Sequence, residues 1–181
     1  MLLTAIIVLI VDQYTKHLAI VHLAPSPERG GWPRWINIIP GFFDLRWAEN
    51  TGGAFSFMHT QPWVILGIAS LMIVGILIWA YRMPQKNFII QLSFGLIIGG
   101  AIGNIIDRTR FGYVIDFLHF YIVRNGREHF WPTFNVADMG IVAGIAIFMV
   151  LTLFTKLLDP VAVEPPALES DDLSPAAQEE S

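Results

Sequence analysis

The sequence has no cysteine, so disulfide bonds and thiol nucleophiles are excluded. Charge is also scarce: Asp, Glu, Lys and Arg make up 14% of the 181 residues, against about 25% in an average soluble domain. Hydrophobic residues make up 54%, and they are concentrated in long runs with few or no charged residues. This distribution argues against a water-soluble protein.

Four of these runs are long enough to cross a membrane, since a hydrocarbon core about 30 Å thick needs about 20 helical residues. The predicted spans are residues 2–23, 63–81, 88–106 and 136–158. A soluble four-helix bundle would keep a charged face on each helix, and the second and third runs have none. The sequence predicts an all-α polytopic membrane protein with four transmembrane helices. We expect the first span to be retained, because no Lys or Arg precedes it as in a signal peptide.

Between the first two spans lies a long segment, residues 24–62, in which polar and apolar residues alternate from Asp44 to Trp47. Alternation of this kind favours a short strand, and the glycines after Asn50 favour a turn. We expect a small β element at the membrane surface. An irregular loop is the alternative that the sequence leaves open.

The last segment, residues 159–181, differs from the rest of the chain. It has seven acidic residues and four prolines but no Lys or Arg, and such a segment cannot offset the entropy cost of ordering. We expect a disordered acidic tail. Without it, the membrane domain, residues 1–158, has a net charge of +3 instead of the overall −4. No nucleic-acid partner is expected.

Carboxylates in or beside the spans are the candidate functional groups, because a charge at the centre of a bilayer costs about 2.5–3.5 kcal/mol or more. Asp12 and Lys16 are four residues apart on one helix face, so they can neutralise each other. Asp107 and Arg108 close the third span and could cap the helix end or hold the following loop, with Asn104 one turn earlier. We interpret the Asp12–Lys16 pair as structural.

Asp116 and Asp138 are the other two candidate acids in or beside the predicted spans. Antiparallel third and fourth spans would place both on one side of the membrane, and an interfacial or re-entrant path for residues 109–120 would bring them together. Two carboxylates in a dry site share a proton, so one could activate water while the other protonates a carbonyl or a leaving amine. That is aspartic-peptidase chemistry. Two helix caps, or stations of a proton relay in a small transporter, are the alternatives.

Two other patterns have simpler interpretations. His119 and His129 lack the helical spacing of metal ligands, so we expect interfacial histidines and no metal or cofactor. Glycines in the third and fourth spans have small-xxx-small spacing, which lets helices approach closely. They are predicted to be structural, although a non-catalytic assembly factor would use the same glycine faces.

Five segments together resemble one family, the bacterial lipoprotein signal peptidases (signal peptidase II). The segments are residues 12–16 (Asp-Gln-Tyr-Thr-Lys), 50–55 (Asn-Thr-Gly-Gly-Ala-Phe), 100–108 (Gly-Ala-Ile-Gly-Asn-Ile-Ile-Asp-Arg), 114–117 (Val-Ile-Asp-Phe) and 134–138 (Phe-Asn-Val-Ala-Asp). They occur in the order of the family pattern and are spread over residues 12–138, a range that includes nearly everything except the tail. The combination is specific, although each segment alone would be weak.

The resemblance implies an aspartic endopeptidase that removes signal peptides from prolipoproteins whose cysteine already carries diacylglycerol. It assigns the catalytic dyad to Asp116 and Asp138 and needs no cofactor. The resemblance further implies polar residues that line or support the site: Asp12, Lys16, Asn50, Asn104, Asp107, Arg108 and Asn135. Prolipoproteins and membrane lipids are the expected partners, and we expect a monomer.

The resemblance also implies a location in the bacterial cytoplasmic membrane, with both termini in the cytoplasm and the active site toward the outer face. A plain count of Lys and Arg in the loops favours the opposite orientation. We follow the family here, because the positive-inside rule is statistical. The chain departs from the family pattern by lacking a polar lead before the first span and by its acidic tail.

Overall fold

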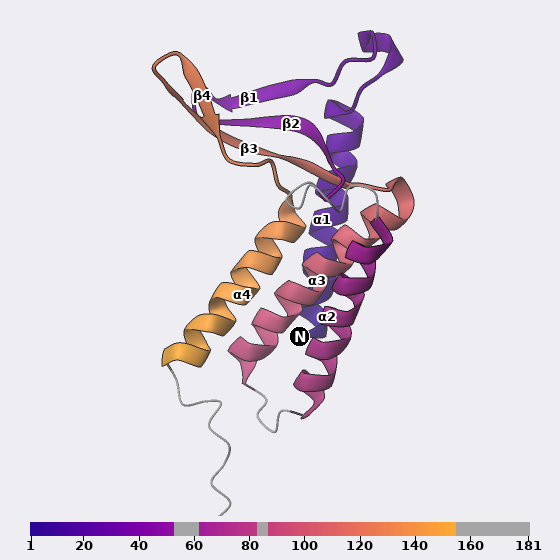
Figure 1. Ribbon diagram of the computed structural model, residues 1–181, viewed down its shortest axis with the longest axis vertical. Coiled ribbons are helices and arrows are strands. Elements are labelled where there is room, and N and C mark those ends of the chain that lie inside the picture. The colour runs from indigo at the N-terminus through magenta and orange to yellow at the C-terminus, as the bar shows by residue number, and fades with distance from the viewer. Residues whose placement is uncertain (53–61, 83–86, 155–181) are drawn as a thin grey trace, which may run out of the picture.

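The computed structural model describes residues 1–52, 62–82 and 87–154. Four long helices stand side by side, and a small sheet covers one end of them (Figure 1). The helices are α1 (Leu2–Leu23), α2 (Pro62–Arg82), α3 (Phe88–Phe111) and α4 (Val136–Phe154), and a short 3-10 helix, η1 (Pro27–Arg29), follows α1. The strands are β1 (Trp35–Ile39), β2 (Phe43–Asn50), β3 (Val114–Arg124) and β4 (Arg127–Phe130).

Three helices in the described part of the chain are long and apolar enough to cross a membrane: α1, α3 and residues 136–153 of α4. The chain is therefore a membrane protein, as the composition predicts. α2 has 21 residues but is not among the three, so four transmembrane helices are not confirmed. The predicted acidic tail, residues 159–181, and the end of the fourth predicted span lie outside the described residues.

The helix boundaries follow from local signals. α1 has the predicted bounds, whereas α3 extends five residues past the predicted end at 106 and finishes at Phe111. Gly112 ends it with a φ of 82°, a left-handed conformation that glycine adopts without strain. Asp107 and Arg108 therefore lie inside the helix and do not cap its end.

Glycines bring the helices into contact, as their spacing predicts. A Cβ at Gly99 would lie 2.6 Å from the carbonyl oxygen of Ala5 in α1, and a Cβ at Gly144 would lie 2.6 Å from that of Ser93 in α3. Gly103 meets the carboxylate of Asp12 in the same way. α3 is therefore packed tightly against both α1 and α4, with backbone close to backbone.

The four strands form one antiparallel sheet in the order β1-β2-β3-β4. β1 and β2 confirm the predicted β element. Residues 109–120, for which an interfacial or re-entrant path is predicted, form the end of helix α3, up to Phe111, and the first part of strand β3, from Val114. β3 pairs with β2 along its first half and with β4 at its far end. The sheet rests on α1, where Ala19 and Leu23 pack against Ile115 and Phe117.

Candidate active site

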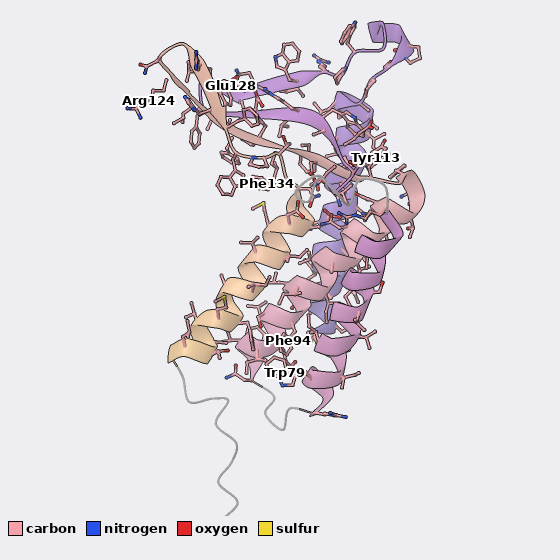
Figure 2. The ribbon with its side chains drawn as sticks, viewed as in Figure 1. Trp79, Phe94, Tyr113, Arg124, Glu128 and Phe134 are labelled. Atoms are coloured by element: carbon pink, nitrogen blue, oxygen red, sulfur yellow. The ribbon has the colours of Figure 1, made fainter. Side chains whose placement is uncertain are left out.

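The predicted polar residues gather where the helices meet the sheet. In Figure 2 this junction lies between the labelled Tyr113, at the start of β3, and Phe134, just before α4. α1, α3, α4 and the two central strands each contribute side chains to it. All nine predicted site residues lie in the described part of the chain, and hydrogen bonds or ion pairs link them into one group: Asp12, Lys16, Asn50, Asn104, Asp107, Arg108, Asp116, Asn135 and Asp138.

Lys16 contacts three other residues of the group, and only 2% of it is exposed. Its ammonium contacts Asp12 at 3.0 Å, Asp107 at 2.8 Å and the side-chain oxygen of Asn104 at 2.9 Å. Three acceptors match the three N–H donors of a lysine. The predicted Asp12–Lys16 pair is thus part of a larger buried network that ties α1 to α3.

Asp12 and Asp107, the two acids beside Lys16, also hydrogen-bond to the elements that carry Asp116 and Asp138. One Asp12 oxygen accepts a hydrogen bond at 2.9 Å from the backbone N–H of Ala137, in the first turn of α4. One Asp107 oxygen accepts at 3.1 Å from the N–H of Ile115, the residue before Asp116. Both contacts are buried, so the network fixes the start of α4 and the start of β3 relative to α1 and α3.

Asn135 and Asp138 form a reciprocal cap at the start of α4. The Asn135 side-chain oxygen accepts from the N–H of Asp138 at 2.9 Å, and the Asp138 carboxylate accepts from the N–H of Asn135 at 3.2 Å. This is the geometry of a capping box, which satisfies two N–H groups that a helix start otherwise leaves free. Asp138 therefore has a fixed position at a helix N-terminus, where the helix dipole favours its negative charge.

The same Asn135 also binds Asp116. Its amide nitrogen donates to an Asp116 oxygen at 2.7 Å, while Asn50 at the end of β2 donates to the other Asp116 oxygen at 2.9 Å. Asn104 donates to Asp138 at 2.8 Å. The two predicted catalytic carboxylates are thus held around one asparagine, and each accepts from neutral amide donors.

Burial and the neighbouring carboxylate change the protonation of Asp116. Only 1% of this residue is exposed. Burial first, and then the charge of Asp138, raise the pKa of Asp116 to about 7, against the lowering effect of the hydrogen bonds from Asn50 and Asn135. A carboxyl group with this pKa can hold a proton near neutrality and release it.

Arg108 supplies positive charge beside this pair. Its guanidinium is attracted to the carboxylates of Asp138, Asp116 and Asp107, in that order, and it donates weakly to the carbonyl oxygen of Asn104 at 3.5 Å. The residue is only partly buried. It can therefore interact with the acids and also with a molecule that enters the site.

Two residues have roles that the sequence did not indicate. Gln13 donates to Asp12 and Asp107 at 3.2 Å each and to the carbonyl oxygen of Gly103 at 3.3 Å. His119, predicted to be interfacial, is instead buried, with Nδ1 3.0 Å from Asp44. The position of Gln13 between Asp12 and Lys16 in one motif was the only signal available for it.

Metal coordination has no support in the described residues. Within residues 1–52, 62–82 and 87–154, no three His, Asp or Glu side chains are grouped so that they could hold a metal ion. In the same ranges, every buried side-chain nitrogen or oxygen has a hydrogen-bond partner. The site is thus a closed network of carboxylates, amides and two cations.

Comparisons with known proteins identify the family of this chain. Residues 4–154 match the family model described as signal peptidase (SPase) II. A lipoprotein signal peptidase of Symbiobacterium thermophilum is 37% identical over 153 residues, which cover 84% of this chain and 93% of that protein. One of Oleidesulfovibrio alaskensis is 43% identical over 157 residues, covering 84% of this chain and 92% of that protein.

A solved structure of a bacterial membrane enzyme has the same fold, with a TM-score of 0.68 and 26% identity, covering 83% of this chain and 85% of the other. The family match extends over α1, α3, α4 and the sheet, which are the elements that build the polar network. The chain is an enzyme, a peptidase that belongs to the signal peptidase II family.

Proposed function

We propose that this chain cleaves signal peptides from diacylglyceryl-modified prolipoproteins by an aspartic mechanism, with Asp116 and Asp138 as the catalytic dyad. The observation that carries the proposal is Asn135, which binds Asp116 through its amide and is reciprocally hydrogen-bonded to Asp138. Membership of the lipoprotein signal peptidase family supports the type of substrate. We add two proposals to this: that the substrate carries a diacylglyceryl group, and that Asp116 and Asp138 form the catalytic dyad.

The two carboxylates have different surroundings, which suggests different roles. Asp116 is buried and its pKa is raised to about 7, so it is the natural proton donor. Asp138 is partly exposed and lies at a helix N-terminus close to Arg108, a position in which positive partial charges surround it. We assign Asp138 as the group that takes a proton from the attacking water.

The reaction then balances without a metal or a covalent intermediate. Water adds to the scissile carbonyl carbon, its proton passes to Asp138, and the proton of Asp116 passes to the carbonyl oxygen. The C–N bond of the resulting diol breaks as Asp138 protonates the amine, and the second hydroxyl returns its proton to Asp116. Both carboxyl groups end in their starting states, and the proton transfers account for a factor of about 10²–10⁴ each.

The remaining polar residues hold this pair in place. Asn50 and Asn104 orient the two carboxylates, and Arg108 offsets their combined charge. Lys16, Asp12 and Asp107 form the network beneath them. We propose that the last three act through position and charge and do not contact the scissile bond.

For topology, we propose that α2 is a fourth span. Its 21 residues have a length of about 30 Å as a helix. Four spans would place both ends of the chain on one side of the membrane. Following the family resemblance, we propose that this side is the cytoplasm and that the sheet lies at the outer face of the bacterial cytoplasmic membrane. A prolipoprotein would present its scissile bond there, because its signal helix stays in the core and its lipid in the outer leaflet. We propose that the enzyme acts as a monomer.

The test uses purified full-length protein and a synthetic diacylglyceryl prolipoprotein, with release of the signal peptide followed by mass. Asp116→Asn and Asp138→Asn should each reduce the rate by about 10²-fold or more, while Glu128→Gln, an acid of the same sheet outside the site, should retain it. Cleavage at the original rate in either aspartate variant would overturn the dyad. Cleavage of the unmodified prolipoprotein at the same rate would overturn the proposed requirement for diacylglycerol.

A further inference from the structure

A pocket of about 270 Å³ lies between the last third of α1 and the sheet. Thr15, Leu18 and His22 line it from α1, and Ile36, Leu45 and Phe117 line it from β1, β2 and β3. The volume is slightly below the range of pockets that hold whole drug-sized ligands. It would suit part of a slim, flexible chain.

The lining residues are apolar apart from Thr15 and His22. The hydroxyl of Thr15 hydrogen-bonds to the backbone carbonyls of Val11 and Asp12, both at 2.9 Å. It is thus already satisfied and need not bond a ligand. An occupant of this pocket must be apolar, because a polar group would lose its hydrogen bonds to water without gaining others.

The position of the pocket indicates the source of such an occupant. α1 is one of the helices long and apolar enough to span a membrane, and the pocket follows it from Thr15 to its end at Leu23. Leu18 is 38% exposed at the pocket. The backbone N–H of Arg34 donates to the carbonyl oxygen of Leu23 at 2.9 Å, so a cationic residue lies at this end of α1. Acyl chains and lipid phosphates are the molecules that meet such a surface.

The pocket and the dyad lie on opposite faces of β3. Asp116 and Phe117 are consecutive residues of this strand, and successive side chains of a strand point to opposite faces. Asp116 points to Asn135 and Asn50, whereas Phe117 packs toward α1. An acyl chain attached to the substrate next to its scissile bond would have to cross the strand to reach the pocket.

We propose that this pocket holds one acyl chain of a membrane phospholipid, distinct from the lipid of the substrate. The chain fills the gap between α1 and the sheet, beside the residue that follows Asp116. The bound lipid thereby stabilises the packing of β3 against α1. This role is independent of which residues form the dyad.

The test uses the full-length protein in lipid nanodiscs that contain phosphatidylglycerol with a diazirine in one acyl chain. After illumination, the labelled peptides are mapped by mass. Labelling should be enriched at Leu18, His22 and Ile36 above the other lipid-exposed residues of α1. Equal labelling along α1, with none on β1, would overturn the proposal.

A matched pair of variants distinguishes labelling in the pocket from general labelling of α1 by the surrounding lipid. Leu18→Trp fills the pocket and should abolish labelling of β1, whereas Val21→Trp, at a 51% exposed position of α1 that does not line the pocket, should leave it unchanged. Equal melting temperatures in lipid-free detergent check that both variants fold. If an excess of diacylglyceryl lipopeptide displaces the label, the chain in the pocket belongs to the substrate and the proposal is wrong.

Discussion

Two aspartates of the sheet, Asp44 and Asp116, are hidden to the same extent, with 1% of each residue exposed. Asp44 contacts the guanidinium of Arg46 at 2.9–3.0 Å and the ring of His119 at 3.0 Å. Asp116 instead accepts from the amides of Asn50 and Asn135. A cation in direct contact stabilises a buried carboxylate, whereas neutral amides leave part of its desolvation cost uncompensated.

Burial is the same for both aspartates, so the charge of their partners is what distinguishes them. The acids around Lys16 differ from the proposed dyad in the same respect. Asp12 and Asp107 share a full cation at 2.8–3.0 Å, so they are suited to hold structure. The following predictions test this division, from the largest expected effect to the smallest.

Lys16→Met should be the most damaging change to stability. It leaves Asp12 and Asp107 buried without their cation, which costs about 3–5 kcal/mol. Chemical denaturation in detergent micelles measures the loss. A double variant, Lys16→Met with Asp107→Asn, should recover part of it. An unchanged free energy of unfolding in Lys16→Met would show that the network does not depend on its charge.

Asp116 should make the protein less stable as pH rises. Its pKa is raised in the folded state to about 7 from an unfolded value of about 3.9. The folded state therefore binds the proton more tightly, and the stabilisation present below pH 4 is lost as pH rises toward 7. The upper limit is about 4 kcal/mol at 1.36 kcal/mol per pKa unit.

Denaturation of Asp116→Asn and the parent protein between pH 4 and pH 8 measures this loss. The variant should gain stability relative to the parent as pH rises. Asn37→Ala, which changes no titratable group, is the control and should show no such gain. The same gain in both variants would show that the effect does not come from the Asp116 carboxyl group.

Asn50→Ala should shift the pH dependence of peptide cleavage. The hydrogen bond from Asn50 lowers the pKa of Asp116, so its loss raises that pKa further. If Asp116 must be protonated, the alkaline limb of the rate profile moves to higher pH by about one unit or less, the equivalent of one hydrogen bond.

The matched control is Asn37→Ala, an asparagine of β1 that bonds the hydroxyl of Tyr121 at 3.5 Å. Asn37→Ala should leave the alkaline limb of the rate profile at the same pH. If the acidic limb of the Asn50→Ala profile moves to higher pH while the alkaline limb stays in place, Asp116 must be deprotonated and acts as the base.

Glu128→Gln should have the smallest effect. Glu128 is 37% exposed on its side chain and pairs with Arg46 at 3.1 Å, and exposed pairs contribute about 0–1 kcal/mol. Arg46 still neutralises Asp44 after the change. A loss above about 2 kcal/mol would show that the pair is coupled to the buried cluster.

The sequence predicted most of what composition and motifs determine: the bounds of α1, the apolar helices, a β element after α1 and the residues of the polar network. It did not predict β3 and β4. Residues 117–123 form an almost continuous apolar run, in which strand and helix cannot be told apart by periodicity. Only pairing with β2 resolves the choice. The buried contact between His119 and Asp44 was not predicted for a similar reason, because the two residues are 75 positions apart.

The hydrogen bond between Asp12 and the N–H of Ala137 joins residues 125 positions apart. In the described part of the chain, the first long helix and the last one thus contribute to the same site, and Asp138 is one residue beyond that contact. A chain still in synthesis, with α1 in the membrane and α4 not yet made, lacks Asp138 of the proposed dyad. We therefore expect cleavage to begin only when α4 has docked against α1 and α3, so that activity reports the insertion of α4.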